Sequence, residues 1–210
     1  MLIDLHTLNR KYALYGGKVN GVLHVGAHTG EEGVVYDELG YRPVYWVEAD
    51  EDTIPKLWDE VHEFEGHEII NAVVADQVGK TVTFNVANNE QSSSILELGT
   101  HETEHPEVHY TGSRELEATT IDQLLADDMI TQTNFLNLDI QGAELLALKG
   151  AKQFLKGVDF IYSEVNVKEL YKGGALLPQL DGFLDMRGFD RRETEMTPHG
   201  WGDGFWCRRK

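Results

Sequence analysis

Short apolar runs alternate with helical segments through the first third of the chain. Residues 22–26, 42–50 and 67–75 form apolar runs that are typical of buried strands. Residues 31–39 begin with acids and end at a glycine, and apolar residues in 51–65 are spaced three and four apart, so both segments are predicted helices. We expect Asp50 to cap the second helix. This β-α-β-α-β order predicts a parallel sheet with right-handed crossovers.

The alternation continues after one interruption. Residues 80–88 alternate apolar and polar positions, which predicts a half-buried strand. Residues 88–117 are polar and irregular, and we expect a substrate-side loop or insertion there, because long loops in compact domains are usually functional. The later predicted elements are helices at 120–125, 143–155 and 176–184, and strands at 134–141, 158–166, 189–196 and 204–209, the last two as a hairpin.

Candidate ligand-binding residues lie at the strand ends, where open α/β sheets bind their ligands. The first strand ends in Gly26-Ala27-His28-Thr29-Gly30, and glycines there let the backbone approach a ligand closely. Glu48 ends the second strand, 18 residues past Gly30, where an acid can accept hydrogen bonds from both hydroxyls of a ribose. These residues predict a nucleoside pocket. Its other strand-end candidates are Ala49, Asp50, Ala72, Val73, Asp139 and Gln141.

The glycine spacing bears on which nucleoside binds. A dinucleotide site needs a G-x-G-x-x-G loop, and here His28 stands in place of the middle glycine. Its side chain would obstruct a pyrophosphate, so an NAD(P)-dependent oxidoreductase is the less favoured alternative. S-adenosylmethionine has no pyrophosphate, and its cationic sulfonium suits an acidic pocket. On their own, Gly26 and Gly30 are equally consistent with turn residues that touch no ligand.

Charge and cysteine content narrow the class of protein. The chain has 18 Lys and Arg against 36 Asp and Glu, a formal net charge of −18, so we expect no nucleic-acid partner. Cys207 is the single cysteine, which fits a reducing compartment. The chain shows no signal peptide and no apolar stretch long enough to span a membrane. We therefore expect a cytoplasmic protein without a membrane span.

Several segments resemble the FkbM-type methyltransferases. They run in order over roughly residues 20–206 and include VLHVGAHTGEE, WVEADEDTIPKL, SSSIL, TTIDQL, YSEVN and, most specifically, NFLNLDIQGAELLALKGA. The resemblance implies the Rossmann-like α/β fold of class I methyltransferases, with a mostly parallel seven-stranded sheet, helices on both faces and an antiparallel last strand. It implies S-adenosyl-L-methionine as methyl donor, and O-methylation of a hydroxyl on a sugar or a natural-product-like small molecule.

The same resemblance implies how the domain is arranged and adds one candidate for cofactor binding. Residues 1–210 are expected to form a single methyltransferase domain, in which 88–117 and the C-terminal loops hold the acceptor. Ser93, within SSSIL, becomes a further candidate for cofactor binding. A non-catalytic alternative stays open, in which a degenerate methyltransferase fold binds the donor and regulates a partner.

Methyl transfer to a hydroxyl needs near-attack geometry and a group that takes the proton. Asp139 is the first candidate for that base, although it could instead cap the helix that begins near Ala143. Glu164 and Asn166 end an apolar strand and are further catalytic candidates, and His199 is an alternative base.

Metal binding has two weaker candidates. Asp139, Glu164 and Asn166 resemble the oxygen ligands of catechol-type O-methyltransferases, which would suit Mg²⁺, but the carboxamide stands two residues from the acid rather than beside it. His101, His105 and His109 are four residues apart, a ligand spacing on a helix, yet Pro106 argues against a helix there. No residue is therefore assigned as a metal ligand.

Overall fold

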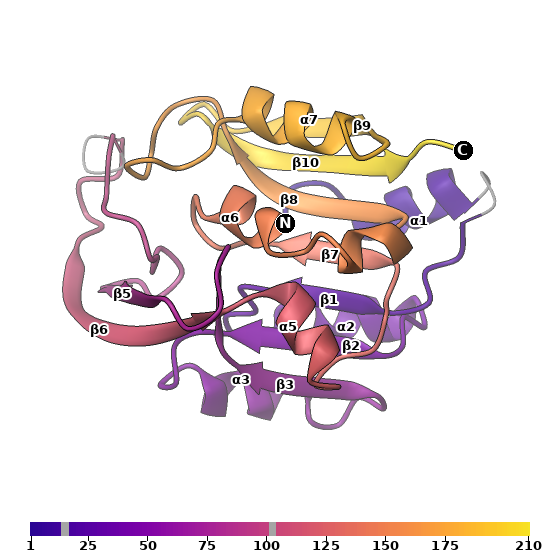
Figure 1. The fold of residues 1–210 in the computed structure, drawn as a ribbon, viewed down its shortest axis with the longest axis horizontal. Helices are drawn as coiled ribbons and strands as arrows, with labels where there is room; N and C mark the ends of the chain where they lie inside the picture. The colour runs from indigo at the N-terminus through magenta and orange to yellow at the C-terminus, as the bar shows by residue number, and fades with distance from the viewer. Residues whose placement is uncertain (14–16, 101–103) are drawn as a thin grey trace.

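A seven-stranded sheet forms the centre of the protein, with the strand order β3-β2-β1-β7-β8-β10-β9 (Figure 1). The computed structural model describes residues 1–13, 17–100 and 104–210. β10 is antiparallel to both of its neighbours, and the other pairs are parallel, so the predicted fold class and the predicted terminal hairpin are confirmed. The strands are β1 (Val22–Val25), β2 (Val44–Glu48), β3 (His67–Asn71), β7 (Phe135–Leu138), β8 (Phe160–Asn166), β9 (Phe189–Met196) and β10 (Trp201–Arg208).

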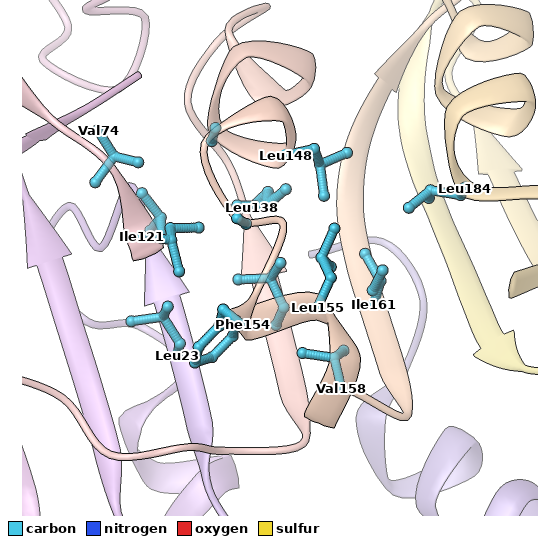
Figure 2. Packing of buried hydrophobic residues seen from close by; sticks show 14 of the residues in the cluster. Leu23, Val74, Ile121, Leu138, Leu148, Phe154, Leu155, Val158, Ile161 and Leu184 are labelled. Carbon is cyan, nitrogen blue, oxygen red and sulfur yellow. The ribbon is translucent and has the colours of Figure 1, made fainter. Parts of the chain in front are cut away.

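Helices cover both faces of this sheet because its central strands are apolar on both sides. Val22, Val44 and Trp46 face one side, where they pack against α1 (Leu5–Ala13), α2 (Gly33–Glu38) and α3 (Ile54–Val61). Leu23 and Leu138 belong to the other core, which Figure 2 shows in close-up. That core is closed by α5 (Ile121–Ala126), α6 (Glu144–Lys149), the 3₁₀ helix η1 (Phe154–Gly157) and α7 (Leu177–Asp185).

Two predicted helices differ from the structure. The expected helix 143–155 is two shorter elements, since α6 ends at Lys149 and a 3₁₀ helix begins at Phe154. Gly150 lies between them, so close to the backbone of Ala75 that a Cβ on it would be 2.4 Å from the Ala75 carbonyl oxygen. The prediction that Asp50 caps α3 was wrong, since the N-cap position belongs to Thr53. The Asp50 carboxylate accepts hydrogen bonds from the N–H of Asp52 at 3.2 Å, in the turn before α3, and from the guanidinium of Arg114 at 2.8 Å.

A second, three-stranded sheet has the order β4-β6-β5. It consists of β4 (Val73–Val74), β5 (Thr81–Ala87) and β6 (Tyr110–Thr119), and β5 and β6 extend past the carboxyl ends of the parallel strands (Figure 1). The expectation of irregular structure through 88–117 was therefore wrong for residues 110–117, which pair with β5. Both faces of β6 are largely polar, so its sequence lacks the apolar alternation that marks a strand.

The loop after β1 and the loop after β7 touch backbone to backbone. The N–H of Gly26 donates to the Val47 carbonyl at 2.9 Å, and the N–H of Asp139 donates to the Val25 carbonyl at 2.9 Å. Gly26 has a φ of +87°, and a Cβ built on it would lie 1.8 Å from the carbonyl oxygen of Asp139. Only glycine fits this contact, which brings the ends of β1, β2 and β7 together.

We predict that Gly26→Ala costs about 3–5 kcal/mol of unfolding free energy, since left-handed strain and a backbone overlap add. Gly40→Ala is the matched control. Gly40 also has a positive φ, of +68°, but nothing lies within 4 Å of its added Cβ. It should lose only about 1–2 kcal/mol, from strain alone. Urea denaturation measures both, and equal losses would contradict the proposed close contact.

Candidate functional site

Two adjoining cavities lie at the carboxyl edge of the large sheet. Both are open to solvent. The first spans about 610 Å³ and the second about 1470 Å³ of space, open solvent included. Their linings share five residues at the ends of β1 and β7 and in the 88–109 segment: Gly26, His28, Gln91, Asp139 and Gln141. A molecule bound in the first cavity can therefore reach a second molecule at Asp139.

Glu48 is the fixed polar group of the first cavity. Its carboxylate is 9% exposed and accepts hydrogen bonds from the backbone N–H groups of His28 and Asp50, each at 2.8 Å. Burial raises the pKa of Glu48, whereas these hydrogen bonds lower it. Each carboxylate oxygen has a second lone pair, so Glu48 can still accept hydrogen bonds from two ligand hydroxyls.

The remaining surface of the first cavity is mainly apolar. Ala72 and Ile140 follow β3 and β7, Val73 begins β4, and Phe84 and Ile95 come from β5 and the segment after it. The hydroxyl of Ser94 donates to the Gln141 carbonyl oxygen at 2.8 Å and ties that segment to the loop after β7. The cavity thus combines an apolar slot with acidic groups, among which Glu48 is buried and fixed by backbone hydrogen bonds, and this combination suits a nucleoside.

Gln141 connects the carboxyl groups at the ends of β7 and β8. Its Nε2 donates to Asp139 Oδ1 at 2.7 Å and to Glu164 Oε2 at 2.6 Å, and the hydroxyl of Tyr171 donates to its Oε1 at 2.7 Å. Asn166 Nδ2 lies 3.3 Å from Glu164 Oε1. Burial, followed by the negative charge of Asp139, raises the pKa of Glu164 well above its ordinary value. The folded protein therefore favours the protonated form of Glu164.

Asp139 does not cap α6, because Glu144 supplies the local hydrogen bonds. Glu144 Oε1 accepts from the backbone N–H groups of Ile140 at 3.1 Å and Gly142 at 3.0 Å, and the N-cap position is Ala143. Burial raises the pKa of Glu144 to about 7. Glu144 is thus a buried brace for the loop rather than a partner of the helix dipole alone, and Asp139 is left facing both cavities.

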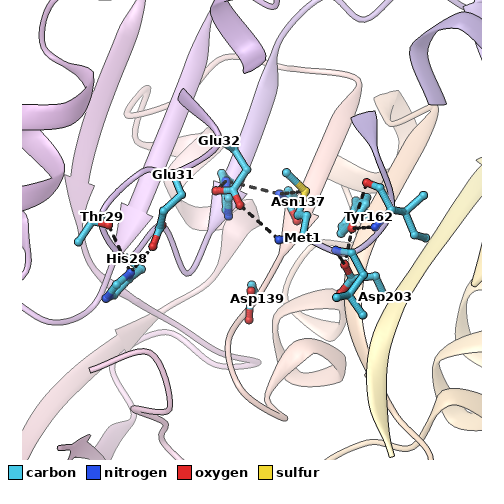
Figure 3. A network of polar contacts seen from close by, with 12 residues as sticks. Met1, His28, Thr29, Glu31, Glu32, Asn137, Asp139, Tyr162 and Asp203 are labelled. Carbon is cyan, nitrogen blue, oxygen red and sulfur yellow. Dashed lines mark hydrogen bonds and ion pairs between the residues drawn. The ribbon is translucent and has the colours of Figure 1, made fainter. Parts of the chain in front are cut away.

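The second cavity is acidic. Its lining includes Glu31, Glu32, Glu107, Asp139, Glu164 and Asp203, and no lysine or arginine within the described ranges lines it. The carboxylate of Glu31 pairs with His28 at 2.9 Å, and this bond lowers the pKa of Glu31 to about 2 and raises that of His28 (Figure 3). Burial raises the pKa of Glu32 to about 7 and lowers that of His24 to about 3.

The cavities bring together most of the predicted site residues. Among the cofactor candidates, Gly26, Ala27, His28, Glu48, Ala49, Asp50, Ala72, Val73, Ser93, Asp139 and Gln141 line one or both cavities. Thr29 and Gly30 line neither, and a Cβ at Gly30 would instead meet Val61 and Leu57 of α3, so its role is packing. His199 also lines neither cavity. It is half-exposed, with its ring 4.8 Å from that of His105.

Sequence reasoning missed the residues that line the second cavity from within strands. His24, Asn137 and Tyr162 lie in β1, β7 and β8, and all three are buried. Each interrupts an otherwise apolar strand with a polar group, and buried polar groups need partners. That interruption was the available signal.

The structure does not support the Mg²⁺ alternative. Gln141 already occupies oxygens of both Asp139 and Glu164 with its amide. In the part of the chain that the structure describes, no group of three or more His, Cys, Asp or Glu side chains could hold a metal ion. His101 of the predicted histidine spacing lies outside the described residues.

The fold and the paired cavities define the protein as a class I methyltransferase by architecture. The structure is similar to magnesium protoporphyrin IX methyltransferase ChlM from Synechocystis, determined with bound SAM, with a TM-score of 0.54, 10% identity, and 97% of this chain and 77% of that chain covered. It is also similar to Aeropyrum pernix fibrillarin with natively bound S-adenosyl-L-methionine, with a TM-score of 0.50, 12% identity, and 90% and 66% covered.

The sequence places the chain more narrowly. Residues 24–191 match the methyltransferase FkbM domain, and the chain belongs to that family. It is similar to the 2-O-methyltransferase NoeI of Sinorhizobium fredii, with 23% identity over 184 residues that cover 81% of this chain and 74% of NoeI. None of the helices described here is long and apolar enough to cross a membrane.

We predict a pH-dependent effect of Glu32→Gln on stability. The raised pKa of Glu32 means that the folded state favours its protonated form, so folding loses stability as pH rises from the ordinary pKa of 4.5 to about 7. Gln has the same shape without the charge. The variant should gain up to about 3 kcal/mol over the wild type between pH 4 and pH 8. Urea denaturation across this range tests it, and a constant difference would refute it.

Proposed function

We propose that the protein is an S-adenosylmethionine-dependent O-methyltransferase that acts on a hydroxyl of an uncharged, sugar-like or natural-product-like small molecule. The observation that carries this proposal is the meeting of the two cavities at Asp139. A nucleoside-shaped cavity with its own carboxylate adjoins a larger polar cavity, and the chain belongs to a methyltransferase family.

The residues of the first cavity fit the donor. Glu48 has free lone pairs for two ribose hydroxyls, and Ala72, Val73 and Ile140 offer an apolar slot for a purine. The acidic lining that continues past Asp139 is compatible with the positive charge of a sulfonium. His28 lines both cavities where a dinucleotide site needs glycine, which supports this donor over NAD(P).

The donor supplies a methyl group on a sulfonium and leaves as the neutral thioether S-adenosylhomocysteine when the acceptor oxygen bonds to the methyl carbon. Asp139 stands at the junction of the cavities and takes the proton that the acceptor hydroxyl loses. Glu164 is neutral, so it donates a hydrogen bond rather than competing as a base. Gln141 holds both groups in place and limits the rotation of Asp139.

The lining of the second cavity favours an uncharged acceptor. Carboxylates accept hydrogen bonds from hydroxyl groups, whereas they repel phosphate and carboxylate groups. The formal net charge of −18 opposes a nucleic-acid acceptor in the same way. The name of NoeI, a 2-O-methyltransferase, supports methylation at oxygen. We place the enzyme in the cytoplasm, where the single Cys207 stays reduced.

Isothermal titration with S-adenosylhomocysteine, run beside NAD⁺, tests the donor site. We predict micromolar binding of the first and none of the second. Glu48→Gln should weaken S-adenosylhomocysteine by about 10- to 100-fold, since it loses charged hydrogen bonds worth about 1.5–3 kcal/mol. Glu51→Gln, an exposed change in the same turn, is the control and should bind as the wild type does. Absence of wild-type binding would refute the donor site.

Asp139→Asn should lower kcat by about 10²- to 10⁴-fold, the usual contribution of a positioned general base. The measurement is transfer of a labelled methyl group to a panel of methyl pyranosides and their phosphate esters, of which only the uncharged compounds should react. Asp59→Asn, on the exposed face of α3, is the control. A wild type that binds S-adenosylhomocysteine but methylates nothing on the panel would favour the non-catalytic alternative.

A further inference from the structure

The first residues of the chain lie along one side of the second cavity. Met1 and Leu2 are part of its lining. The backbone N–H of Leu2 donates to the carboxylate of Asp203, and the backbone N–H of Ile3 donates to the hydroxyl of Tyr162 at 3.1 Å (Figure 3). The segment is therefore attached to the cavity through its backbone. The amino group of Met1 adds an ion pair with Glu32 at 3.7 Å, and the Ile3 side chain packs against the core.

Tyr162 and Asp203 form a rigid support for this segment. Tyr162 lies in β8 and Asp203 in the neighbouring strand β10, and their side chains are 1% and 5% exposed. The Tyr162 hydroxyl donates to Asp203 Oδ2, the same oxygen that accepts from Leu2. A buried carboxylate with two donors is stable only while both remain, so loss of either donor loosens the whole contact.

The helix behind the segment fixes its other end. Leu5, Leu8 and Tyr12 of α1 belong to the core cluster on that face of the sheet, where Tyr12 packs against Phe205 at 5.1 Å between ring centroids. Tyr162 belongs to the same cluster through its ring, whereas its hydroxyl bonds to Asp203 and accepts from the N–H of Ile3. The fold can thus keep α1 in place without the bonds to Leu2 and Ile3, and those bonds serve the cavity.

We propose that Met1 and Leu2 form one wall of the acceptor cavity, and that Tyr162 and Asp203 are positioning residues that hold this wall and so determine which acceptors fit. The proposal rests on the proposed function, because it assigns the second cavity to the acceptor. Met1 and Leu2 add apolar side chains to a lining rich in carboxylates. An acceptor that matches both has hydroxyl groups and an apolar face, as a pyranose ring does.

Two substitutions weaken the attachment of residues 1–3 to Tyr162 and Asp203, and neither changes a residue that lines the donor cavity. Tyr162→Phe deletes the shared hydroxyl and keeps the ring in the core. Ile3→Pro deletes the N–H that donates to Tyr162, and Ile3→Val, which keeps that N–H, is its matched control. Ile3 lines neither the donor nor the acceptor cavity, so its side chain is not expected to contact a bound molecule.

Two measurements test the wall. One is hydrogen exchange of the N-terminal peptide, and the other is the kinetics of methyl transfer to the methyl pyranoside that is the best substrate of the wild type. Tyr162→Phe and Ile3→Pro should speed exchange in residues 1–4 at least tenfold and raise the acceptor KM about tenfold. In both variants kcat and the Kd of S-adenosylhomocysteine should stay within about twofold of the wild type, because the reacting atoms lie at Asp139. Ile3→Val should match the wild type in every readout.

Three results would overturn the wall. Residues 1–4 of the wild type exchanging as freely as an unstructured peptide would show that the attachment does not form. An unchanged KM in both variants would show that it does not matter to the acceptor. Faster turnover at all acceptor concentrations would make the segment a blocking element instead. Failure of S-adenosylhomocysteine to bind the wild type refutes the proposed function separately, and the exchange experiment still decides whether the segment is attached.

Discussion

The close backbone contact between Gly26 and Asp139 is the constraint on which the site depends. β1 and β7 are adjacent parallel strands at the centre of the sheet, and the strand order reverses between them. A side chain at residue 26 would force their two loops apart. Because no side chain is present, Asp139 lies at the boundary of the two cavities, and Glu48 reaches the loop after β1 through the N–H of His28.

The close approach of these loops also brings carboxyl groups together. Their mutual repulsion and burial cost stability, and hydrogen bonds reduce that cost. Glu144 and Glu164 are buried, and the negative charge of Asp139 raises the pKa of both. Gln141 places one amide between Asp139 and Glu164, so each carboxyl has a donor although no cation is involved. Its backbone has a φ of +54°, which is strained for a residue with a side chain. That strain, next to the paired carboxyls, is consistent with a catalytic rather than a purely structural loop.

The parts of this protein that are predictable from sequence are those that local patterns determine. The apolar runs of β1 and β2 and the position of Glu48 at a strand end needed only periodicity and chain order. Strand β6 was missed because it is polar on both faces, and pairing with β5 rather than burial makes it a strand. Helix α1 was missed although Leu5, Leu8 and Tyr12 have helical spacing, because the helix is short and its partner Phe205 lies nearly 200 residues away.

The predicted site shows the same division. Residues of the first cavity were predictable because they stand at strand ends. The second cavity also uses His24, Asn137 and Tyr162, which lie inside strands, and Leu2, which is far from them in sequence. No local pattern joins these positions, since their neighbours are set by strand order and by the path of the N-terminal segment. His199 was a reasonable candidate by residue type, but in the β9–β10 turn it lies behind His105, which lines the second cavity, and does not line a cavity itself.

This division has a physical consequence for how the two cavities can vary. The donor cavity is built from backbone contacts at the centre of the sheet, so most changes there disturb folding as well as binding. One side of the second cavity, the proposed acceptor cavity, is formed by Met1 and Leu2, whose attachment depends on the Tyr162 hydroxyl and on Asp203 rather than on the apolar packing of the two cores. Under the proposed function, the acceptor can therefore change at a lower cost in stability than the donor.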